Sequence, residues 1–350
     1  MGRYSLRNEN IQLIYGKLAM SKPIIGVLGG SGFVGSYLSN ELIQHGYAVR
    51  IITRKRENAK HLWILPDTEI KSIQTFTGQS LNQVVDGCIA VVNLVGILNE
   101  KWDNGKGFKS AHTDVAESLL KACEETKIPQ LIQISALNAN KSTASHYLSS
   151  KNKAEAILLA KRSDEHTEAT RNRGASRLPK VTILRPSVIF GSQDSFTNRF
   201  HTLLKFSPPI FPLPMGHTRV QPIYVGDVVK AILKIIQDPR ARIEAYDIVG
   251  PEILTLKEIV EYIAKIANYR TKILPLGNGL SAIQANILQY CPGKPFSRDN
   301  LRSLQVESIC TDENGLSQLN ITPTSMDSIV PRYLAKRSSR FAYYKFRDRT

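Results

Sequence analysis

Short apolar runs alternate with stretches of helical periodicity through the first half of the chain. The first helical stretch carries an apolar stripe at Val34, Leu38 and Leu42 and ends at His45-Gly46. The expected strands are 24–28, 48–53, 70–73, 88–95, 130–134 and 181–184, with further helices over 109–126 and 147–160. Several of these strands are apolar on both faces, which is typical of buried parallel strands. The pattern predicts repeated βα units in the α/β class, forming a Rossmann-type doubly wound parallel sheet.

The same pattern divides the chain into segments. Residues 22–190 are expected to form the Rossmann domain, and the polar, aperiodic stretch 162–178 a surface insertion within it. Four prolines after Gly191 predict an irregular region, before helices resume over 225–237 and 256–268. Residues 191–334 therefore predict a smaller mixed α/β cap on the substrate side, interleaved with the Rossmann core. The remaining segments are an N-terminal extension, 1–21, and a C-terminal tail, 335–350.

A glycine-rich turn follows the first expected strand. It reads Gly29-Gly30-Ser31-Gly32-Phe33-Val34-Gly35, which satisfies both G-x-x-G-x-x-G and G-x-G-x-x-G. Glycines at these positions permit a tight turn and a close backbone approach to a pyrophosphate, whose charge faces the helix N-terminus. Because the turn joins a buried strand to an amphipathic helix, it predicts dinucleotide binding. The alternative is a relic loop that no longer binds.

The end of the second expected strand indicates which dinucleotide is bound. An NAD-selective site places Asp or Glu there, whereas this chain reads Thr53-Arg54-Lys55-Arg56. A carboxylate repels a 2′-phosphate, and an arginine grips it through two hydrogen bonds. Arg54, assisted by Thr53 or Lys55, therefore favours NADPH (NADP) over NADH. The plainer interpretation is a solvated basic turn.

The charge balance is strongly basic, since 46 Lys and Arg against 30 Asp and Glu give a net charge of +16. Such a field favours anionic partners: phosphorylated cofactors, acidic proteins, nucleic acid or an anionic membrane surface. Cations and aromatic residues interleave in the tail, which suits a membrane headgroup layer or an acidic partner. The same mixture of cations and aromatic residues can also bind nucleic acid, with the aromatic rings stacked on its bases. No RNA-recognition motif is evident, so nucleic acid is the least favoured partner.

Other classes are disfavoured by what the sequence does not contain. The four cysteines lie far apart without a CxxC pair, and the seven histidines show no ligand spacing. We therefore expect no disulfide framework and no metal. No run of about 18 apolar residues exists that would span a membrane. The first 19 residues are interpreted as a dispensable extension, or as preceding a start at Met20, rather than as a secretory signal.

Further segments carry a family resemblance. In order, they read NLVGIL at 93–98, Ser135-Ala136-Leu137, Tyr147-x-x-x-Lys151, RPSVIFG at 185–191, QPIYVGDV at 221–228, VGPE at 249–252 and PFSRDNL at 295–301. With the glycine-rich turn, they resemble the extended or atypical branch of the short-chain dehydrogenase/reductase superfamily. The NLVGIL and SRDNL segments look more specifically like the nucleotide-binding accessory subunits of respiratory complex I and their bacterial relatives. The resemblance runs from about Lys22 to about Leu334.

The resemblance implies a site and a cofactor role. Tyr147 would exchange the substrate proton, Lys151 would contact the nicotinamide ribose and lower the phenol pKa, and Ser135 would polarise a carbonyl. Leu94, Val95, Gly96, Pro186 and Val188 would also bind the cofactor, with Pro186 and Val188 under the nicotinamide. The family is implied to hold NADPH tightly, often as a structural or regulatory cofactor beside the quinone-reactive part of complex I. Related members are associated with ubiquinone biosynthesis.

Two departures from the family pattern weaken the prediction of catalysis. Ser135 lies only 12 residues before Tyr147, and Thr77 stands where an acidic residue often contacts the adenine. A bound cofactor that rarely turns over is therefore slightly favoured over active hydride transfer. His112 and His146 are expected to be packed or surface residues. Asp227 is interpreted as a helix cap rather than a catalytic acid.

Three functions remain open. The first is an NADPH-binding atypical reductase that supports respiratory complex I or quinone-biosynthesis proteins. It would be cytoplasmic and peripheral on the inner membrane face, or on the matrix side in a mitochondrion. The second is a soluble NADPH-dependent reductase, or an NAD-dependent epimerase/dehydratase-like enzyme, acting on a small carbonyl substrate. The third is a non-catalytic NADPH sensor or an RNA binder.

Overall fold

The computed structural model describes residues 22–335 except 77, 142–143, 164–177, 208, 239–243 and 291–295. Four sequence predictions therefore lie wholly or almost wholly outside the described residues. They are the extension 1–21, the adenine contact of Thr77, the insertion 162–178 and the basic tail.

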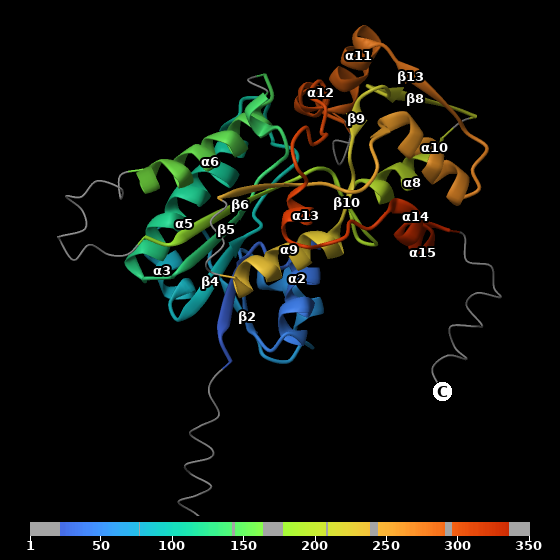
Figure 1. Cartoon of the computed structure of the whole chain (residues 1–350). Coiled ribbons are helices and arrows are strands. Elements are labelled where there is room, and N and C mark those ends of the chain that lie inside the picture. The colour runs from blue at the N-terminus through green and yellow to red at the C-terminus, as the bar shows by residue number, and fades with distance from the viewer. Residues whose placement is uncertain are drawn as a thin grey trace, which may run out of the picture.

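A seven-stranded, wholly parallel sheet forms the centre of the molecule (Figure 1). The strand order is β11-β6-β5-β4-β1-β2-β3. The bounds are β1 Ile24–Leu28, β2 Ala48–Thr53, β3 Thr68–Ser72, β4 Cys88–Asn93, β5 Gln130–Ile134, β6 Lys180–Pro186 and β11 Ala245–Ile248. This is the predicted Rossmann-type sheet, and the α/β fold class is confirmed. Its seventh strand, β11, was not predicted.

Helices cover both faces of the sheet and bury separate apolar clusters. On one face α2 (Phe33–Gln44) and α9 (Val225–Gln237) pack against β1 and β2 through Leu38, Leu42 and Ile232. The other face is covered by α3 (Gln79–Val85), α5 (Asp114–Glu125) and α6 (His146–Ser163). These helices bury a second apolar cluster that includes Leu81, Leu119 and Leu158. The sheet is therefore apolar on both sides, as the sequence pattern indicated.

A smaller cap follows β6 in the chain. Its helices are α8 Thr197–Lys205, α10 Leu256–Ile266, α11 Asn278–Leu288, α12 Arg298–Leu304, α14 Met326–Ile329 and α15 Pro331–Leu334, whereas α13 Gly315–Gln318 packs on β11 and belongs to the Rossmann core. Paired strands are β7 Ile189–Phe190 with β10 Ile223–Tyr224, β9 Arg219–Val220 with β12 Leu254–Thr255, and β8 Ile210–Pro214 with β13 Lys272–Leu276. The chain re-enters the Rossmann core at α9 and β11, so cap and core interleave.

The proline-rich segment is not irregular as predicted, because Ile210–Pro214 forms the parallel strand β8 beside β13. Pro212 and Pro214 stand two residues apart, so their missing N–H groups fall on the same edge of the strand. The N–H groups of Phe211 and Leu213 lie on the opposite edge and remain available for pairing. Among the described strands β8 pairs with β13 alone, so it accommodates both prolines.

Asp227 also differs from its predicted role as a helix cap. The helix α9 begins at Val225, and Asp227 lies fully buried within its first turn. Its carboxylate accepts hydrogen bonds from the backbone N–H of Thr324 at 2.7 Å and from the Thr324 hydroxyl at 3.0 Å. Asp227 thus ties the last part of the cap to the Rossmann core.

Candidate nucleotide and substrate site

The strand order reverses between β1 and β4, and the loops after these two strands pack tightly together. Gly29 has a φ of 73°, and a Cβ built on it would lie 3.1 Å from the carbonyl carbon of Leu94 and 3.2 Å from the backbone nitrogen of Val95. Glycine alone meets both constraints at low cost. Open α/β sheets bind ligands outside the carboxyl ends of their strands at such a reversal.

The glycine-rich turn presses the start of α2 against the end of β1. A Cβ on Gly35 would lie 2.5 Å from both the Cα and the carbonyl oxygen of Gly30, so no other residue fits. Gly32 caps the helix, and Phe33 and Val34 begin it, with no acidic side chain in the first turn. The positive end of the α2 dipole therefore meets no carboxylate from its own first turn, which favours a phosphate there.

The residues after β2 lie beside this turn. The Thr53 hydroxyl is buried 3.3 Å from the Ser31 hydroxyl, which joins the two loops. Arg54 and Lys55 are exposed, and the Arg54 guanidinium lies 5.9 Å from the centre of the Phe76 ring. A cation over an aromatic face is held in position while its N–H donors stay available.

Tyr147 and Lys151 share one face of α6 near the ends of β4 and β5. The Lys151 side chain is buried, and its Nζ donates to the carbonyl oxygen of Ile134 at 3.0 Å. A Cβ built on Gly96 would lie 3.5 Å from the Lys151 Nζ, so the loop after β4 is also close. Burial lowers the pKa of Lys151 to about 8, against an opposing effect of the Glu155 charge.

The phenol of Tyr147 packs in an aromatic cluster. Its ring meets those of Phe108 and His112 edge-on, with centroids 5.9 and 5.5 Å away. Burial raises the pKa of Tyr147 to about 12, and the negative charge of Asp299 adds to this rise. The phenol is therefore protonated at neutral pH.

Ser135 directly follows β5 and has an unused hydroxyl. Its Oγ is buried without a hydrogen-bond partner among the described residues, although buried polar groups are normally paired. Beside it, the N–H of Leu137 donates to the carbonyl oxygen of Pro186 at 3.0 Å, which joins the ends of β5 and β6. The orphaned hydroxyl fits a site that accepts a polar ligand group, as a nicotinamide dinucleotide and a carbonyl substrate would provide.

His112 is a packed residue, as expected. The Ser150 hydroxyl donates to the carbonyl oxygen of Tyr147 at 2.7 Å, so it accepts from the Nδ1 of His112, also at 2.7 Å. The His112 Nε2 then accepts from the backbone N–H of Ile97 at 3.1 Å. Burial, and to a lesser extent the Lys151 charge, lower the pKa of His112 to about 2, so the ring is neutral. It holds the loop after β4 against α6.

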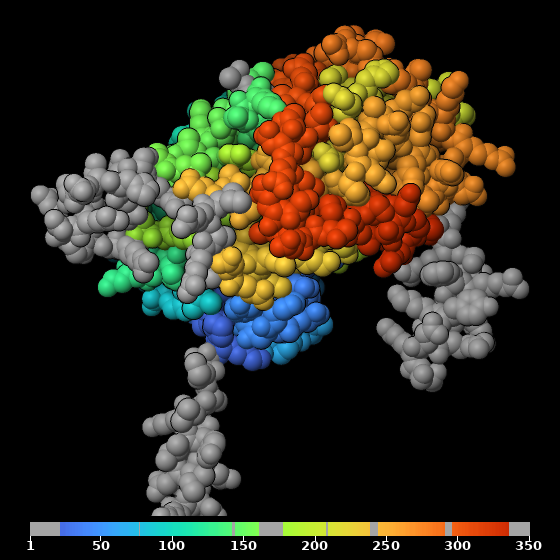
Figure 2. Space-filling model, viewed as in Figure 1, coloured from blue at the N-terminus to red at the C-terminus, as the bar shows by residue number. Residues whose placement is uncertain are grey.

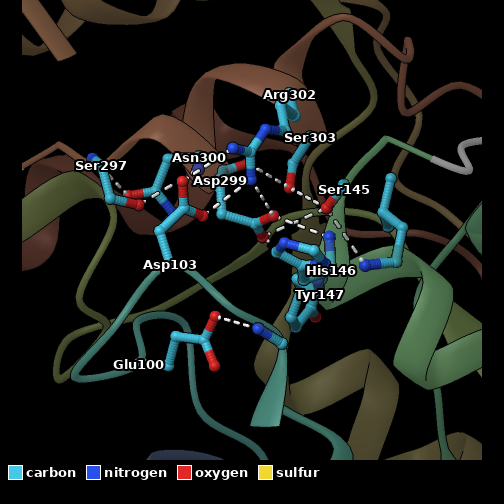
Figure 3. A network of polar contacts seen from close by, with 12 residues as sticks. Glu100, Asp103, Ser145, His146, Tyr147, Ser297, Asp299, Asn300, Arg302 and Ser303 are labelled. Atoms are coloured by element: carbon cyan, nitrogen blue, oxygen red, sulfur yellow. Dashed lines mark hydrogen bonds and ion pairs between the residues drawn. The ribbon is translucent and has the colours of Figure 1, made fainter. Parts of the chain in front are cut away.

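The cap contributes an acidic residue that sequence reasoning did not single out. Asp299, on α12, is buried, and its carboxylate lies at the start of α6 (Figure 3). It accepts from the backbone N–H groups of His146 at 2.7 Å and Tyr147 at 3.1 Å, and from the Ser145 hydroxyl at 3.2 Å. The Ser145 hydroxyl in turn accepts from the N–H of Leu148 at 3.2 Å. All three N–H groups of the first turn are thereby satisfied.

The same short helix also holds the loop after β4. Arg302 grips Asp103 with two hydrogen bonds of 2.7 Å and lies 3.5 Å from Asp299 (Figure 3). The Asn300 amide donates to the carbonyl oxygen of Leu98 at 3.2 Å. Only the family resemblance had marked the SRDNL segment. Its Ser297-x-x-Asn300 spacing, which forms a capping box here, also signals a helix start.

The predicted site residues therefore gather at one edge of the sheet. The predicted cofactor-binding residues lie at the carboxyl ends of β1, β2, β4, β5 and β6, in the loops that follow them or on the neighbouring helices α2 and α6. The described residues contain no group of three or more His, Cys, Asp or Glu that could hold a metal. Of the helices in the described part of the chain, none is long and apolar enough to cross a bilayer.

Residues 25–249 match the model of the NAD dependent epimerase/dehydratase family. The chain belongs to this family. It is 26% identical over 336 residues to the NADH dehydrogenase [ubiquinone] 1 alpha subcomplex subunit 9 of Arabidopsis thaliana, covering 91% of this chain and 79% of that protein. The mouse protein of the same name is 26% identical over 320 residues, covering 89% and 80%. The resemblance found in the sequence motifs is thereby confirmed.

Other similarities extend beyond complex I. The ceramide reductase of Caulobacter vibrioides is 22% identical over 256 residues, covering 73% of this chain and 74% of that protein. Among solved structures, the UDP-N-acetylglucosamine 4-epimerase of Methanobrevibacter ruminantium superimposes with a TM-score of 0.66 and 16% identity, covering 93% of this chain and all of that one. MoeE5 with UDP-glucuronic acid and NAD gives a TM-score of 0.65 at 17% identity, covering 88% and 96%. These structures share the fold.

Proposed function

We propose that this protein binds NADPH in the site formed by the glycine-rich turn, Arg54 and the Tyr147–Lys151 helix, and that it serves respiratory complex I. The observation that carries the cofactor proposal is the exposed Arg54 at the end of β2, seated over Phe76 where an NAD-selective protein would carry a carboxylate. Similarity to named complex I subunits over about nine tenths of the chain supports the second half.

The residues would divide the binding between them. The first turn of α2 and the backbone near Gly32 face the pyrophosphate, and Arg54 with Thr53 and Lys55 holds the 2′-phosphate. Lys151 holds the nicotinamide ribose, exchanging its hydrogen bond to Ile134 for one to the ribose. NADPH, when bound, supplies a hydride.

A second candidate function is carbonyl reduction in the same site, because Tyr147, Lys151 and Ser135 are all present there. The Ser135 hydroxyl, otherwise unpartnered, would donate to the substrate carbonyl oxygen. A phenol with a pKa of about 12 keeps its proton at neutral pH, so Tyr147 would act as the proton donor. In the reductive direction, the phenol would give its proton to the carbonyl oxygen as the hydride is added to the carbonyl carbon. Similarity to a protein named ceramide reductase supports this candidate.

The cofactor proposal is tested by binding. Nucleotide released from the purified protein is identified by mass, and NADPH and NADH are titrated against wild type and Arg54→Glu. We expect bound NADPH, and in the variant a loss of NADPH affinity of about tenfold to a hundredfold, since charged hydrogen bonds contribute roughly 1.5–3 kcal/mol. NADH affinity should not fall. The matched control is Arg56→Glu, since Arg56 is also exposed and faces Trp63 instead.

Two results would contradict the proposal. Bound NADH in the purified protein would remove the NADPH preference, and an equal effect of both substitutions would remove the role of Arg54. Turnover is tested separately with a panel of carbonyl compounds and quinones, on wild type and Tyr147→Phe. Activity lost in the variant would establish the reductase. Co-purification with respiratory membranes and complex I tests the assignment to complex I.

A further inference from the structure

One face of the cap exposes an unusual concentration of apolar side chains. On α11, Leu280, Ile283 and Ile287 have 58%, 57% and 63% of their surface exposed, and Tyr290, just beyond the helix, has 81%. Their spacing of three, four and three residues puts them on one side of the helix. A single exposed apolar residue is ordinary, whereas a continuous stripe normally marks a binding surface.

The neighbouring two-stranded sheet extends this stripe. Ile210 and Pro212 on β8 and Leu274 on β13 are exposed, while Leu213 and Ile273 turn inward to the cap core. A groove between sheet and helix is lined by Pro212, Leu276, Leu280, Ile283, Gln284, Ile287 and Leu288. Gln284 is its single polar side chain, and its amide nitrogen donates to the carbonyl oxygen of Pro212 at 3.2 Å. We call the exposed residues Ile210, Pro212, Leu274, Leu280, Ile283, Ile287 and Tyr290 the α11 face.

The α11 face lies at one end of the molecule. Figure 1 shows α11, β8 and β13 together at the end opposite α2 and the first strands. In Figure 2 the orange surface of this part of the cap forms an outer end of the molecule, with yellow-green surface beside it. An apolar face at an end can meet a flat, extended partner without a clash from the Rossmann domain.

The charges around the α11 face indicate what this partner is. Segments 205–216 and 270–290 contain no Asp or Glu, although they contain Lys205, Arg270 and Lys272, all exposed. Phe206, which is 77% exposed, lies beneath the Lys205 ammonium at 5.4 Å. Lys272 pairs with Ile210 of the face in the β8–β13 register, and the two segments that form the face carry cations and aromatic rings but no acidic residue. This combination matches the boundary between the headgroups and the acyl chains of an anionic bilayer.

We propose that the α11 face docks on an anionic membrane surface, with its apolar side chains among the acyl chains and its cations among the lipid phosphates. A second copy of this chain fits less well, because pairing two such faces would bring six cations together without an acidic partner in these segments. The surface is separate from the nucleotide site, so this proposal does not depend on cofactor binding or turnover.

The test is sedimentation of the full-length protein with vesicles of phosphatidylcholine alone or of phosphatidylcholine with cardiolipin. We expect binding to the cardiolipin vesicles only. The triple variant Leu280→Gln, Ile283→Gln, Ile287→Gln should bind at least about tenfold more weakly, given the transfer free energy of such side chains. Replacing Lys205, Arg270 and Lys272 by Gln should also weaken binding, and should reduce its dependence on salt.

Matched controls separate this surface from exposed apolar residues elsewhere. Ile64→Gln and Ile253→Gln change side chains that are 87% and 50% exposed but lie outside the α11 face, and both should bind as wild type does. Thermal unfolding and nucleotide affinity of every variant establish that each is folded.

Several outcomes would overturn the proposal. One is a wild-type protein that ignores cardiolipin vesicles or binds both vesicle types equally. Another is a triple variant that sediments with the vesicles as wild type does. If deletion of residues 336–350 from the wild-type chain abolishes binding while the triple variant still binds, the tail and not the α11 face meets the membrane. A third is a triple variant that still binds vesicles but no longer co-purifies with a protein complex, which would make the α11 face a protein-binding surface.

Discussion

Replacing Asp299 tests whether the cap holds the helix that carries Tyr147. In Asp299→Ala, the backbone N–H groups of His146 and Tyr147 lose the carboxylate that accepts from them, whereas the Ser145 hydroxyl keeps the Ser303 hydroxyl as a partner at 2.8 Å. A lost helix cap costs about 1 kcal/mol, and a buried charge-assisted hydrogen bond roughly 1.5–3 kcal/mol. We expect the free energy of unfolding to fall by about 2–4 kcal/mol. Asp299→Asn keeps one acceptor and should cost about half of that.

Urea unfolding of the two variants measures this loss. The control is Glu307→Gln, which removes a carboxylate that forms two hydrogen bonds of 2.7 and 2.8 Å to Arg219 at an exposed site. An exposed pair of this kind contributes under about 1 kcal/mol. If Asp299→Ala and Glu307→Gln unfold at the same urea concentration, the cap does not hold α6 and the reasoning is wrong.

The pKa of Tyr147 provides a second measurement, which a loss of folding stability alone would not change. The negative charge of Asp299 raises this pKa, after the larger effect of burial. Asp299→Asn should therefore shift the titration of the Tyr147 ring to lower pH, as followed by NMR of ¹³C-labelled tyrosine with Tyr147→Phe to assign the signal. An unchanged titration would mean that the carboxylate acts on the helix backbone alone.

Three further predictions concern packing, pH and the unused hydroxyl. Gly35→Ala should destabilise the protein by about 3 kcal/mol or more and weaken dinucleotide binding, since the added Cβ would lie 2.5 Å from Gly30. Calorimetry measures the stability and titration measures the affinity, and wild-type values of both in the variant would contradict this prediction. The pKa of His112 is lowered from 6.5 to about 2, so below pH 6.5 the unfolded state binds a proton on this residue that the folded state does not bind. This group alone should therefore reduce the free energy of unfolding by about 1.4 kcal/mol for each pH unit of acidification below pH 6.5. Urea midpoints across that range should show a shallower slope in His112→Gln, and an identical slope would refute the assignment. Ser135→Ala should leave the stability of the nucleotide-free protein unchanged or raise it by about 1 kcal/mol, since no hydrogen bond of the Ser135 hydroxyl is lost. The same substitution should weaken ligand binding. A large destabilisation would show that the hydroxyl already has a partner.

Much of the Rossmann half is determined by local sequence. Apolar runs bounded by turns form β1, β2 and β5 at the predicted residues, and the helix end at His45-Gly46 is observed, with Gly46 at a φ of 84°. These features depend on neighbours a few residues apart, so periodicity and glycine positions are sufficient to predict them. The glycine-rich turn and the residues after β2 are likewise predicted from local sequence alone.

The tertiary structure decided what depends on residues far apart. Asp299 meets the start of α6 from 153 positions away along the chain, and no local spacing encodes that contact. The strand β11 carries a short, mixed pattern that becomes a strand only because β6 offers an open edge. The prolines of β8 are tolerated because, of the strands that the structure describes, β13 alone pairs with it.

Exposure is likewise a tertiary property. In the sequence, Leu280, Ile283 and Ile287 have the spacing of a core-facing helix stripe, which periodicity alone would bury. In the folded chain, the opposite side of α11, with Ser281 and Ala285, faces the cap, and the large apolar side chains remain outside. The sequence by itself determined which elements form and where a dinucleotide would bind. Because burial depends on how elements pack and not on their periodicity, only the tertiary structure decided which apolar face was left for a partner.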